Sequence, residues 1–463
     1  MKFIIPKDVK YVLNILSSNG FEAFVVGGCV RDALLDITPH DWDICTDARP
    51  DEIKNAFKDF YTFDSGIKHG TISVVFNKEV YEITTYRIDG SYADNRHPEK
   101  VTFTNSIIMD LSRRDFTINA IAYNEYVGLV DPFNGQADII NRKIRCVNNP
   151  DKRFSEDALR IIRAMRFAST YGFDIEKETS EAIIRNRKLL NNIAAERINI
   201  EFTKLICGIY AENILNKFRD VVAVFIPELS VEFDYNQKSR HHNLDLWHHT
   251  TRSVNLIEPD SVLRIAMLLH DIGKPECKTT DEKGESHFIG HTTVSAEMSR
   301  VILRRLKYSS NFIDECVCLI RNHDVRYSGS PRQLKRLLEK IGESRTEKLF
   351  KIFRADIMAQ SDYEKQKKLS LVDLAEKDFH NIIENEQCFS LKQLAVNGSD
   401  MIAVGIKNGR LIGDTLRKLL DMVINDEIEN DRTLLLEKAK EIAGNNYNQT
   451  QSDVKKFYNV NNA

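Results

Sequence analysis

The sequence lacks any apolar run that approaches the roughly 20 residues needed to cross a membrane as a helix. Its first residues, MKFIIPKDVKYVLNIL, are amphipathic and have no small-residue cleavage site, so they do not resemble a signal peptide. Both absences predict a cytoplasmic protein without a membrane partner.

The sequence also lacks a CxxC pair. Its eight cysteines are scattered, and Cys316 and Cys318, the closest two, have the wrong spacing for a usual zinc site. Cysteines without a pairing pattern predict reduced thiols in the protein core, as is usual in the cytoplasm.

The sequence also lacks an excess of charge of either sign. The 463 residues carry a formal net charge of −3, which neither favours nor excludes a nucleic-acid partner. Residues 141–170, however, contain eight Lys or Arg against three Asp or Glu. The composition, 42% hydrophobic and 29% charged, is that of a globular protein long enough for two or three domains. It leaves the oligomeric state open.

Residues 1–140 mix predicted strands and helices. Short β-branched or aromatic runs bounded by turn residues predict strands, and two stretches have helical spacing. The runs are FEAFVVGG, WDICT, GTISVVFN, VYEITTYR and INAIAYN, and the helical stretches are DVKYVLNILSSNG and PDEIKNAFKDF. From Ser155 almost everything has helical spacing, up to a polar, Asn-rich tail after Gly444. This pattern predicts an α+β domain followed by all-α structure.

Two carboxylates lie close together after a Gly-Gly turn. Asp41 and Asp43 flank Trp42, and on a strand their side chains would project to the same face. Their mutual repulsion favours a cation between them, and Mg²⁺ prefers carboxylate and phosphate oxygens. A pair of such ions supports phosphoryl transfer. The alternative is a solvated strand end with two surface acids.

Residues suited to phosphate surround this pair. Gly27 and Gly28 let the backbone approach a phosphate closely, and Arg31 follows near the expected start of a helix, where backbone N–H groups favour anions. In RRDF, Arg113 and Arg114 offer two guanidinium groups beside Asp115, which can accept from ribose hydroxyls. A plain strand-to-helix turn and a surface charge cluster are the alternatives.

A helix from Ser155, its expected N-cap, would carry a row of charged side chains on one face. Asp157 and Arg160 lie three residues apart, and Arg163 and Arg166 continue the row. An Asp–Arg pair offers both acceptors and donors, as the reading of a base edge requires, while the further arginines suit phosphates. The alternative is a solvated helix face with salt bridges.

Six motifs follow one another in an order and spacing that resemble the class II tRNA nucleotidyltransferases, the bacterial CCA-adding enzymes and their poly(A) polymerase relatives. They are GGCVRD, HDWDI, RRDFTINA, DPFNGQADI, SEDALRIIRAMRFA and AERINIEF, within residues 20–210. The resemblance implies a head of nucleotidyltransferase fold followed by a helical neck, body and tail. It also implies Mg²⁺-dependent addition of CMP and AMP from CTP and ATP to the 3′ end of tRNA, without a nucleic-acid template.

The same resemblance implies roles for individual residues. Asp41 and Asp43 resemble the catalytic Mg²⁺ ligands, and Glu82 in YEITTYR is either a third carboxylate near the metals or an outward-facing strand residue. The implied nucleotide-binding residues are Gly28 and Arg31 at the triphosphate turn, Arg114 and Asp115 at the triphosphate and ribose, Asp157 and Arg160 at the bases of ATP and CTP, and Arg163 and Arg166 as further contacts.

Two features favour full CCA addition within this family. DSGIKHGTISVVF resembles a strand of CCA-adding members, and the basic stretch that marks bacterial poly(A) polymerases is missing there. YRIDGSYADNRHPEKV, residues 86–101, resembles the loop that addition of the last A requires. An A-adding-only enzyme and a poly(A) polymerase are the alternatives.

The C-terminal half contains a second set of candidate ligands. LWHHTTRSV is followed by LRIAMLLHDIGKP, where a His-Asp dipeptide ends an apolar helix, and then by IGHTTVSAEM, RNHD and FRADIMAQ. Imidazole and carboxylate groups on converging helices form divalent metal sites. These stretches resemble the HD phosphohydrolase superfamily, which implies His249, His270, Asp271 and Asp356 as core ligands of a second divalent metal, with His291 and His323 completing the set. A helical body that keeps the motif for packing is the alternative.

The resemblances imply five segments. They are a nucleotidyltransferase head (1–140), a helical neck with a nucleotide- and RNA-binding face (141–215), an HD-type helical domain (216–375), a helical tail (376–445) and a flexible end (446–463). CCA addition is the leading function. A metal-dependent phosphohydrolase whose head only binds nucleotide or RNA, and an RNA-binding module without turnover, are the alternatives from other classes.

Overall fold

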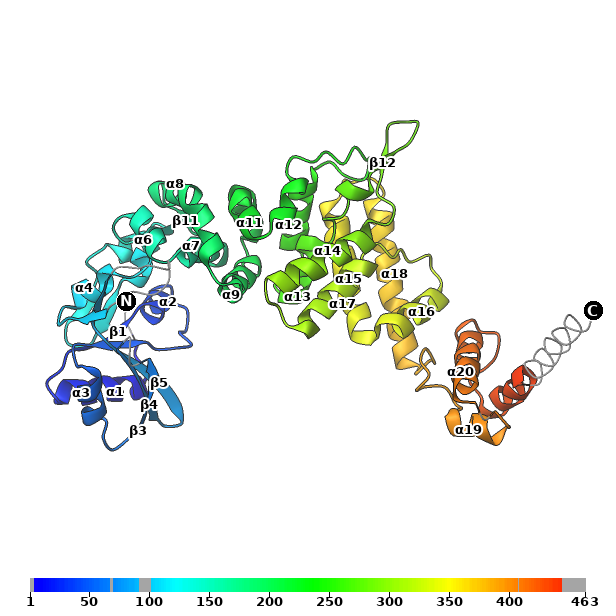
Figure 1. Cartoon of the computed structure of the whole chain (residues 1–463), viewed down its shortest axis with the longest axis horizontal. Helices are drawn as coiled ribbons and strands as arrows, with labels where there is room; N and C mark the ends of the chain where they lie inside the picture. Colours follow the sequence, from blue (N-terminus) through cyan, green and yellow to red (C-terminus); the bar gives the residue numbers. More distant parts are fainter. Residues whose placement is uncertain (1–3, 67–69, 91–100, 407, 444–463) are drawn as a thin grey trace, which may run out of the picture. The chain divides into compact units, whose positions relative to one another are not determined.

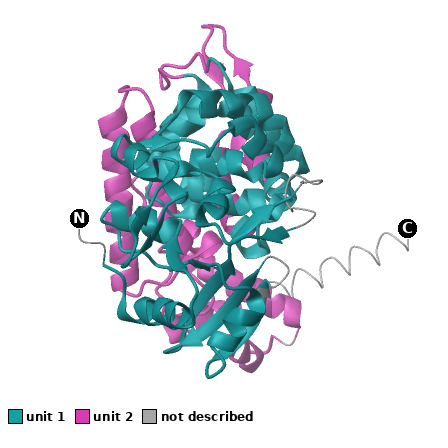
Figure 2. Ribbon diagram, turned by 90° about the vertical axis from the view of Figure 1, so that its left-hand side faces the viewer, with its two compact units in different colours: residues 1–236, 245–268, 298–313 teal, residues 237–244, 269–297, 314–463 magenta. Residues whose placement is uncertain are grey.

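The structure is a computed structural model that describes residues 4–66, 70–90, 101–406 and 408–443. The chain forms two compact units (Figure 1 and Figure 2). Unit 1 consists of residues 1–236, 245–268 and 298–313, and unit 2 of residues 237–244, 269–297 and 314–463. The chain therefore passes between the two units more than once.

Unit 1 begins with a mixed seven-stranded sheet in the order β3-β4-β5-β2-β1-β8-β9. β2 and β5 run parallel, whereas the other neighbours in this sheet run antiparallel. β6 and β7 form a separate antiparallel pair. The strands span Ala23–Val26 (β1), Ile44–Thr46 (β2), Tyr61–Gly66 (β3), Thr71–Phe76 (β4), Glu79–Thr85 (β5), Arg87–Asp89 (β6), Val101–Phe103 (β7), Ala122–Asn124 (β8) and Gly128–Val130 (β9).

Burial explains which strands the sequence predicts. All four residues of β1 are buried, as a short continuous apolar run indicates. In β5 the exposed Glu82 lies between the buried Tyr81 and Ile83, which gives the alternation of a half-buried strand. The five predicted strands are confirmed. The sequence analysis did not identify β3, β6, β7 and β9.

Helices make up most of the rest of unit 1. The two predicted helices near the N-terminus are confirmed as α1 and α3, and α7 packs against α9. The helices span Lys7–Ser18 (α1), Gly28–Leu34 (α2), Pro50–Ala56 (α3), Ile107–Ser112 (α4), Gly135–Ile140 (α5), Pro150–Glu156 (α6), Leu159–Tyr171 (α7), Lys177–Asn186 (α8), Ala195–Ile206 (α9), Ala211–Lys217 (α10), Arg219–Phe225 (α11) and Leu246–Leu256 (α12).

The predicted helix from Ser155 is wrong at its start. α6 ends one residue before Asp157, whose φ of −141° and ψ of 102° are extended, and α7 begins at Leu159. Ser155 lies inside α6, and the N-cap of that helix is Asn149. The N–H of Leu159 donates to Oδ1 of Asp157 at 3.1 Å, which favours a helix start here. Asp157 therefore does not share a helix face with Arg160.

In the described part of unit 2, helices predominate. α13 (Ser261–Leu269), α14 (His291–Arg305) and α15 (Ser310–Asn322) contribute residues to both units. One apolar core gathers residues of α16, α17 and α18, and another surrounds α20. The further helices include Pro331–Ile341 (α16), Glu343–Ala359 (α17), Lys365–Glu384 (α18), Gly398–Ala403 (α19) and Gly409–Ile424 (α20).

Very short strands also occur in the helical part. β10 (Lys143–Ile144) pairs in parallel with β11 (Asp174–Ile175), and β12 (Thr279–Thr280) pairs with β13 (Ser286–His287). Three of these two-residue strands lie after Ser155, where the sequence predicts almost entirely helical structure. The predicted class, a mixed sheet followed by mostly helical structure, is nevertheless confirmed. The division into five segments stays a prediction, and 446–463 lies outside the described residues.

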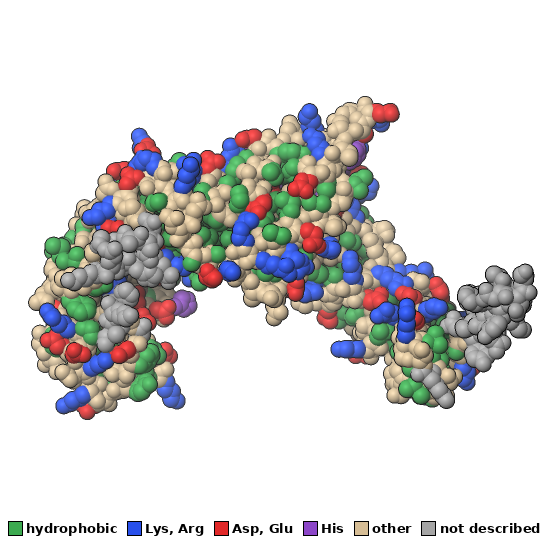
Figure 3. All heavy atoms as spheres, in the orientation of Figure 1, with side chains coloured by type: hydrophobic (Ala, Val, Ile, Leu, Met, Phe, Trp, Pro, Cys, Tyr) green, Lys and Arg blue, Asp and Glu red, His purple; other side chains and the backbone are tan. Residues whose placement is uncertain are grey.

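The surface offers no simple guide to function. On the face that Figure 3 shows, basic and acidic side chains of the described residues are intermixed. No helix among the described residues is long and apolar enough to cross a membrane. Five of the eight cysteines are buried, as predicted for most of them: Cys29, Cys45, Cys146, Cys316 and Cys388. The site must therefore be found from individual side chains.

Candidate functional site

The glycine turn and the second carboxylate meet where β1 ends and β2 begins. Gly27 follows β1 with a φ of +82°, a conformation that favours glycine. A Cβ at this position would lie 2.9 Å from Nη1 of Arg114, so glycine leaves room for the arginine to approach the turn. The N–H of Val26 donates to the carbonyl oxygen of Asp43 at 3.0 Å, which fixes Asp43 beside the turn.

Asp41 and Asp43 lie before β2 and not in it, because the strand begins at Ile44. The strand argument for their common direction is therefore wrong, although both side chains are exposed and close enough to interact. Desolvation raises the pKa of Asp43, the guanidinium of Arg114 lowers it, and the charge of Asp41 raises it further. The repulsion predicted between the two acids is thus present.

Glu82 lies at the same level in the neighbouring strand. Ile83 of β5 pairs with Ile44 of β2, so Glu82 and Asp43 occupy adjacent positions. Glu82 is exposed. Carboxylate oxygens are the ligands that Mg²⁺ prefers, so the side chains gathered here fit that ion.

Asp110, which the sequence analysis missed, holds both arginines of the RRDF stretch. Its buried carboxylate accepts from Nε and Nη2 of Arg113 at 3.0 and 2.7 Å, and from Nη2 of Arg114 at 3.3 Å. Burial raises the pKa of Asp110, but the two guanidinium groups lower it below its usual range. The spacings of three and four residues on a helix could have revealed these pairs.

The structure brings Asp115 together with Arg163 of α7. Nε and Nη2 of Arg163 donate to Oδ2 of Asp115 at 2.9 and 2.7 Å, and the side-chain amide of Asn119 donates to Oδ1 at 3.1 Å. Burial raises the pKa of Asp115, but Arg163 and Asn119 lower it to about 2. Two residues predicted to bind different parts of a nucleotide therefore bind each other.

Three arginines surround the buried ring of Phe167, another residue that the sequence analysis missed. The guanidinium carbons of Arg166, Arg31 and Arg163 lie 4.1, 5.0 and 5.5 Å from its centroid, within the range of cation–π contacts. Arg31 also donates to the side chain of Asn119 at 2.6 Å. α2 begins at Gly28, so the helix start expected near Arg31 is confirmed, and Arg31 is the fourth residue of this seven-residue helix.

Asp157 is bound by Arg197 of α9. Nη2 and Nη1 of Arg197 donate to Oδ2 and Oδ1 of Asp157 at 2.9 and 3.3 Å. Arg160 is buried and donates to Glu156 at 2.8 Å and to the carbonyl oxygen of Arg113 at 3.1 Å. Asp157 and Arg160 are thus near in the chain but are held by different partners.

α9 also supports the arginines of α7. The buried Glu201 pairs with Nε of Arg166 at 2.8 Å and with Nη1 of Arg163 at 3.4 Å. Arg197 and Glu201 are four residues apart, so one face of α9 contacts both Asp157 and this arginine pair. Both lie in AERINIEF, a motif to which the sequence analysis assigned no residue roles.

In unit 2, the ligand atoms of Asp271, His291 and His323 lie within 4.8 Å of one another. Nε2 of His291 and Nε2 of His323 are 3.4 and 3.5 Å from Oδ1 of Asp271. Nδ1 of His291 lies 2.7 Å from the carbonyl oxygen of Phe288, and Nδ1 of His323 lies 2.7 Å from that of Ile320. Such contacts orient histidine ligands in metal sites. The three side chains are buried and form what is called here the Asp271 cluster.

His270 and Asp356 lie beside the Asp271 cluster. Nε2 of His270 is 3.1 Å from Oδ2 of Asp271 and 3.7 Å from Oδ1 of Asp356. The prediction that His270 and Asp271 end an apolar helix is confirmed, since α13 ends one residue earlier. His249 is buried on α12 in unit 1, and its role as a ligand stays a prediction.

The loop after His270 is held tightly. A Cβ at Gly273 would lie 2.7 Å from the backbone nitrogen of Ser295 on α14, so only glycine fits this close approach. Nζ of Lys274 lies 2.6 Å from Oδ2 of Asp271 and donates to Gln237 at 3.1 Å. A carboxylate and histidines held in this way fit a divalent metal.

Comparison with known families assigns a class to the chain. The model described as "Poly A polymerase head domain" matches residues 23–145. "Probable RNA and SrmB- binding site of polymerase A" matches residues 172–232, and "tRNA nucleotidyltransferase domain 2 putative" matches residues 279–439. The mixed sheet and these matches define a nucleotidyltransferase head that is followed by helical domains.

Individual proteins that are similar to this chain identify a family within this class. The CCA-adding enzyme of Enterococcus faecalis (strain ATCC 700802 / V583) is 33% identical over 438 residues, which cover 94% of this chain and 95% of that protein. The CCA-adding enzyme of Leuconostoc citreum (strain KM20) is 49% identical over 205 residues, 44% of this chain and 50% of that protein. A crystal structure of the Bacillus stearothermophilus CCA-adding enzyme in complex with CTP superposes with a TM-score of 0.70 at 30% identity, covering 97% of this chain and 100% of that one. The chain belongs to the family of CCA-adding enzymes.

Proposed function

We propose that this chain completes tRNA 3′ ends by adding CMP and AMP from CTP and ATP without a template. The observation that carries the proposal is the approach of Arg114 to the Gly27 turn beside Asp43, in a chain of the CCA-adding enzyme family. The proposed location is the cytoplasm, and the proposed ion at Asp41 and Asp43 is Mg²⁺.

The proposed reaction is nucleotidyl transfer. The terminal ribose hydroxyl of the RNA forms a bond to the α-phosphorus, and the bond from that phosphorus to the departing pyrophosphate breaks. Mg²⁺, when bound, offsets the charge of the phosphates and favours the ionised hydroxyl. Asp41 and Asp43, with Glu82 at the same level, supply the oxygens that hold it. Arg114, fixed by Asp110, contributes positive charge at the turn formed by Gly27 and Gly28.

The nucleotide itself is proposed to lie against α7. Arg31, Arg163 and Arg166, which surround Phe167, serve the phosphates, and Asp115 serves the ribose. Asp157 and Arg160 read the base. Because Asp157 is bound by Arg197 and Arg160 by Glu156, a base edge must share or replace these partners. Selection of CTP and ATP then depends on α9 as well as on α7.

Three tRNA substrates test this function. tRNA that lacks CCA, tRNA ending in C and tRNA ending in CC are each incubated with labelled CTP, labelled ATP, or both. We expect two CMP additions with CTP alone, and the terminal AMP only after both are in place. AMP addition restricted to tRNA ending in CC identifies an A-adding enzyme, and long AMP runs identify a poly(A) polymerase. No incorporation at all contradicts the proposal.

We also propose a metal-dependent phosphohydrolase in unit 2. The observation that favours it is the Asp271 cluster, with His270 and Asp356 beside it. A divalent metal held there would ionise water and offset the charge of a phosphate. Release of phosphate from phosphoesters with Mn²⁺, Ni²⁺ or Mg²⁺, and its loss after chelation, tests this activity.

A further inference from the structure

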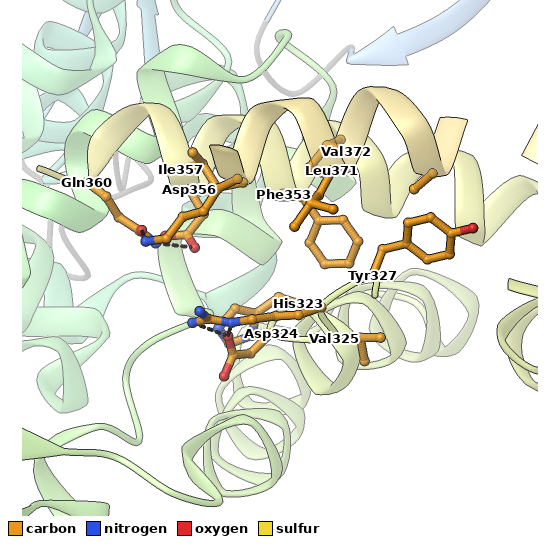
Figure 4. Close-up of a pocket in the computed structure, with 13 residues that line it drawn as sticks. His323, Asp324, Val325, Tyr327, Phe353, Asp356, Ile357, Gln360, Leu371 and Val372 are labelled. Carbon is orange, nitrogen blue, oxygen red and sulfur yellow. Dashed lines mark hydrogen bonds and ion pairs between the residues drawn. The ribbon is translucent and has the colours of Figure 1, made fainter. Parts of the chain in front are cut away.

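A groove in unit 2 begins at the Asp271 cluster. It is polar at that end and apolar at the other. Figure 4 shows Asp356 and Gln360 facing His323 and Asp324 at one end, and aromatic and aliphatic side chains further along. The polar end includes Arg326 and Lys368. The apolar end is lined by Val325, Tyr327, Phe353, Leu371 and Val372.

The polar end connects the carboxylate of Asp356, which is predicted to bind the metal, to a cation. The amide of Gln360 donates to Oδ2 of Asp356 at 2.9 Å, while Oδ1 of Asp356 lies toward His270. Nζ of Lys368 donates to the Gln360 carbonyl at 2.7 Å. A phosphate at the Asp271 cluster would therefore meet the ammonium group of Lys368, which suits its negative charge.

Arg326 adds a second positive charge to the groove. Its side chain is exposed, and it donates to Oδ1 of Asp324 at 3.3 and 3.2 Å. Both partners line the groove near His323. The entrance to the cluster is thus polar and carries two cations, Arg326 and Lys368.

The apolar end excludes a second charged group. Phe353 of α17 and Leu371 of α18 line the same wall, and the hydroxyl of Tyr327 donates to Asp378, which holds that ring in place. A charged group placed among these side chains would lose its hydration without gaining a partner. A flat ring would instead gain apolar and aromatic contacts.

We propose that this groove is the substrate site of the Asp271 cluster and takes phosphate monoesters whose alcohol carries an aromatic ring, nucleotides among them. The inference rests on the phosphohydrolase proposed above. Water forms the new bond to phosphorus, the ester P–O bond breaks, and the departing alcohol takes up the proton that water releases. The ring lies along Phe353 and Leu371, and the phosphate lies between Lys368 and the cluster.

Binding is tested with two phosphonates that cannot be hydrolysed. Phenylphosphonate and methylphosphonate are titrated into the full chain with Mn²⁺ by calorimetry, in an Asp41→Asn, Asp43→Asn background that keeps the unit 1 site from contributing. We expect phenylphosphonate to bind about tenfold more tightly or better, because its ring leaves water. Leu371→Ser should remove this preference. Leu374→Ser, on the same helix and outside the groove, should keep it.

Lys368, one of the two cations at the polar end, provides a second test with its own control. Lys368→Gln should weaken both phosphonates alike, whereas Lys377→Gln, exposed on α18 and outside the groove, should weaken neither. An unchanged affinity for both phosphonates in Lys368→Gln would contradict the assigned phosphate position.

Hydrolysis assays distinguish a failure of the proposed aromatic site from a failure of the phosphohydrolase activity on which it rests. We expect p-nitrophenyl phosphate and AMP to be hydrolysed faster than glycerol 2-phosphate and pyrophosphate, and Leu371→Ser to remove the difference. Equal rates for all four, unchanged by Leu371→Ser, overturn the aromatic site while the phosphohydrolase stands. No hydrolysis with any metal, and no phosphonate binding, overturns both.

Discussion

At the scale of single residues, the charged side chains predicted to bind nucleotide also bind one another or other parts of the protein. These contacts offset the cost of holding charges in a partly buried site. The pairs are Arg31 with Asp32 and Asn119, Arg114 with Asp110, Asp115 with Arg163, Asp157 with Arg197, Arg160 with Glu156, and Arg166 with Glu201.

The first prediction concerns Asp43. Asp43→Asn should lower CMP incorporation by about 100-fold or more, because it removes a charge that positions Mg²⁺ against the developing charge on the phosphates. Single-turnover incorporation into tRNA lacking CCA measures the effect. Asp59→Asn makes the same chemical change at an exposed position of unit 1 and should leave the rate unchanged. Normal incorporation by Asp43→Asn would contradict the proposed metal site.

The second prediction concerns Asp115 and pH. Its folded-state pKa of about 2 lies below the ordinary value of 3.8, so its stabilisation is present above pH 4 and is lost as the pH falls toward 2. Asp115→Asn should be less stable by about 2 kcal/mol near pH 6. Urea midpoints of the two proteins should converge as the pH falls from 4 toward 2, whereas a constant difference would show that the carboxylate charge is not responsible.

At the scale of elements, long periodic stretches were predictable and the break before α7 was not. The helical spacing of α1 and the buried run of β1 are local signals, visible in the sequence. SEDALRIIRAMRFA also has helical spacing, yet the chain is extended at Asp157. The partner that holds Asp157 is Arg197, 40 residues further along, and no local pattern contains that information.

The third prediction concerns α9. Arg197→Ala should free the side chain of Asp157 and raise UTP and GTP incorporation relative to CTP and ATP by about tenfold or more, since a bond to a charged partner is worth roughly 1.5–3 kcal/mol. Incorporation of each triphosphate on one tRNA gives the ratios. Arg187→Ala, which removes an arginine of unit 1 outside this group, serves as the control. An unchanged preference for CTP and ATP would contradict the role of Arg197.

The fourth prediction distinguishes the contact that α9 makes with Asp157 from its contacts with Arg163 and Arg166. Glu201→Gln should weaken CTP and ATP alike by a few fold and leave base preference intact, because it pairs with Arg163 and Arg166, which are assigned to phosphates. KM for each triphosphate is the measurement. A selective effect on one base would place these arginines at the base.

At the scale of the whole molecule, the two candidate activities lie in separate units. The fifth prediction is that His270→Ala with Asp271→Ala abolishes divalent-dependent phosphoester hydrolysis while CCA addition stays within about twofold, because substitutions at sites that share no partner residues usually have independent effects. Both assays are run on the same preparation. His287→Ala, an exposed histidine of unit 2, is the control. Loss of both activities in a folded double variant would show that the units are coupled.

The sequence could supply much of the second site, because His270, Asp271, His291 and His323 stand out as residue types in short motifs. It could not supply the groove beside it. Phe353 and Leu371 belong to different helices, and their helical spacing looks the same whether they line a substrate site or a core. Only their placement next to Asp356 distinguishes the two.

The pairing of Arg163 and Arg166 with Asp115 and Glu201 has a consequence for selectivity in a crowded cell. Bare guanidinium groups would attract any polyanion and release its counterions, so their affinity would fall steeply with ionic strength. Here the protein's own carboxylates already act as counterions. A triphosphate must exchange with them, so fewer small ions are released and the salt dependence of binding is shallow. This exchange therefore favours the binding of a ligand that contacts the protein through a base and a ribose as well as through its charge.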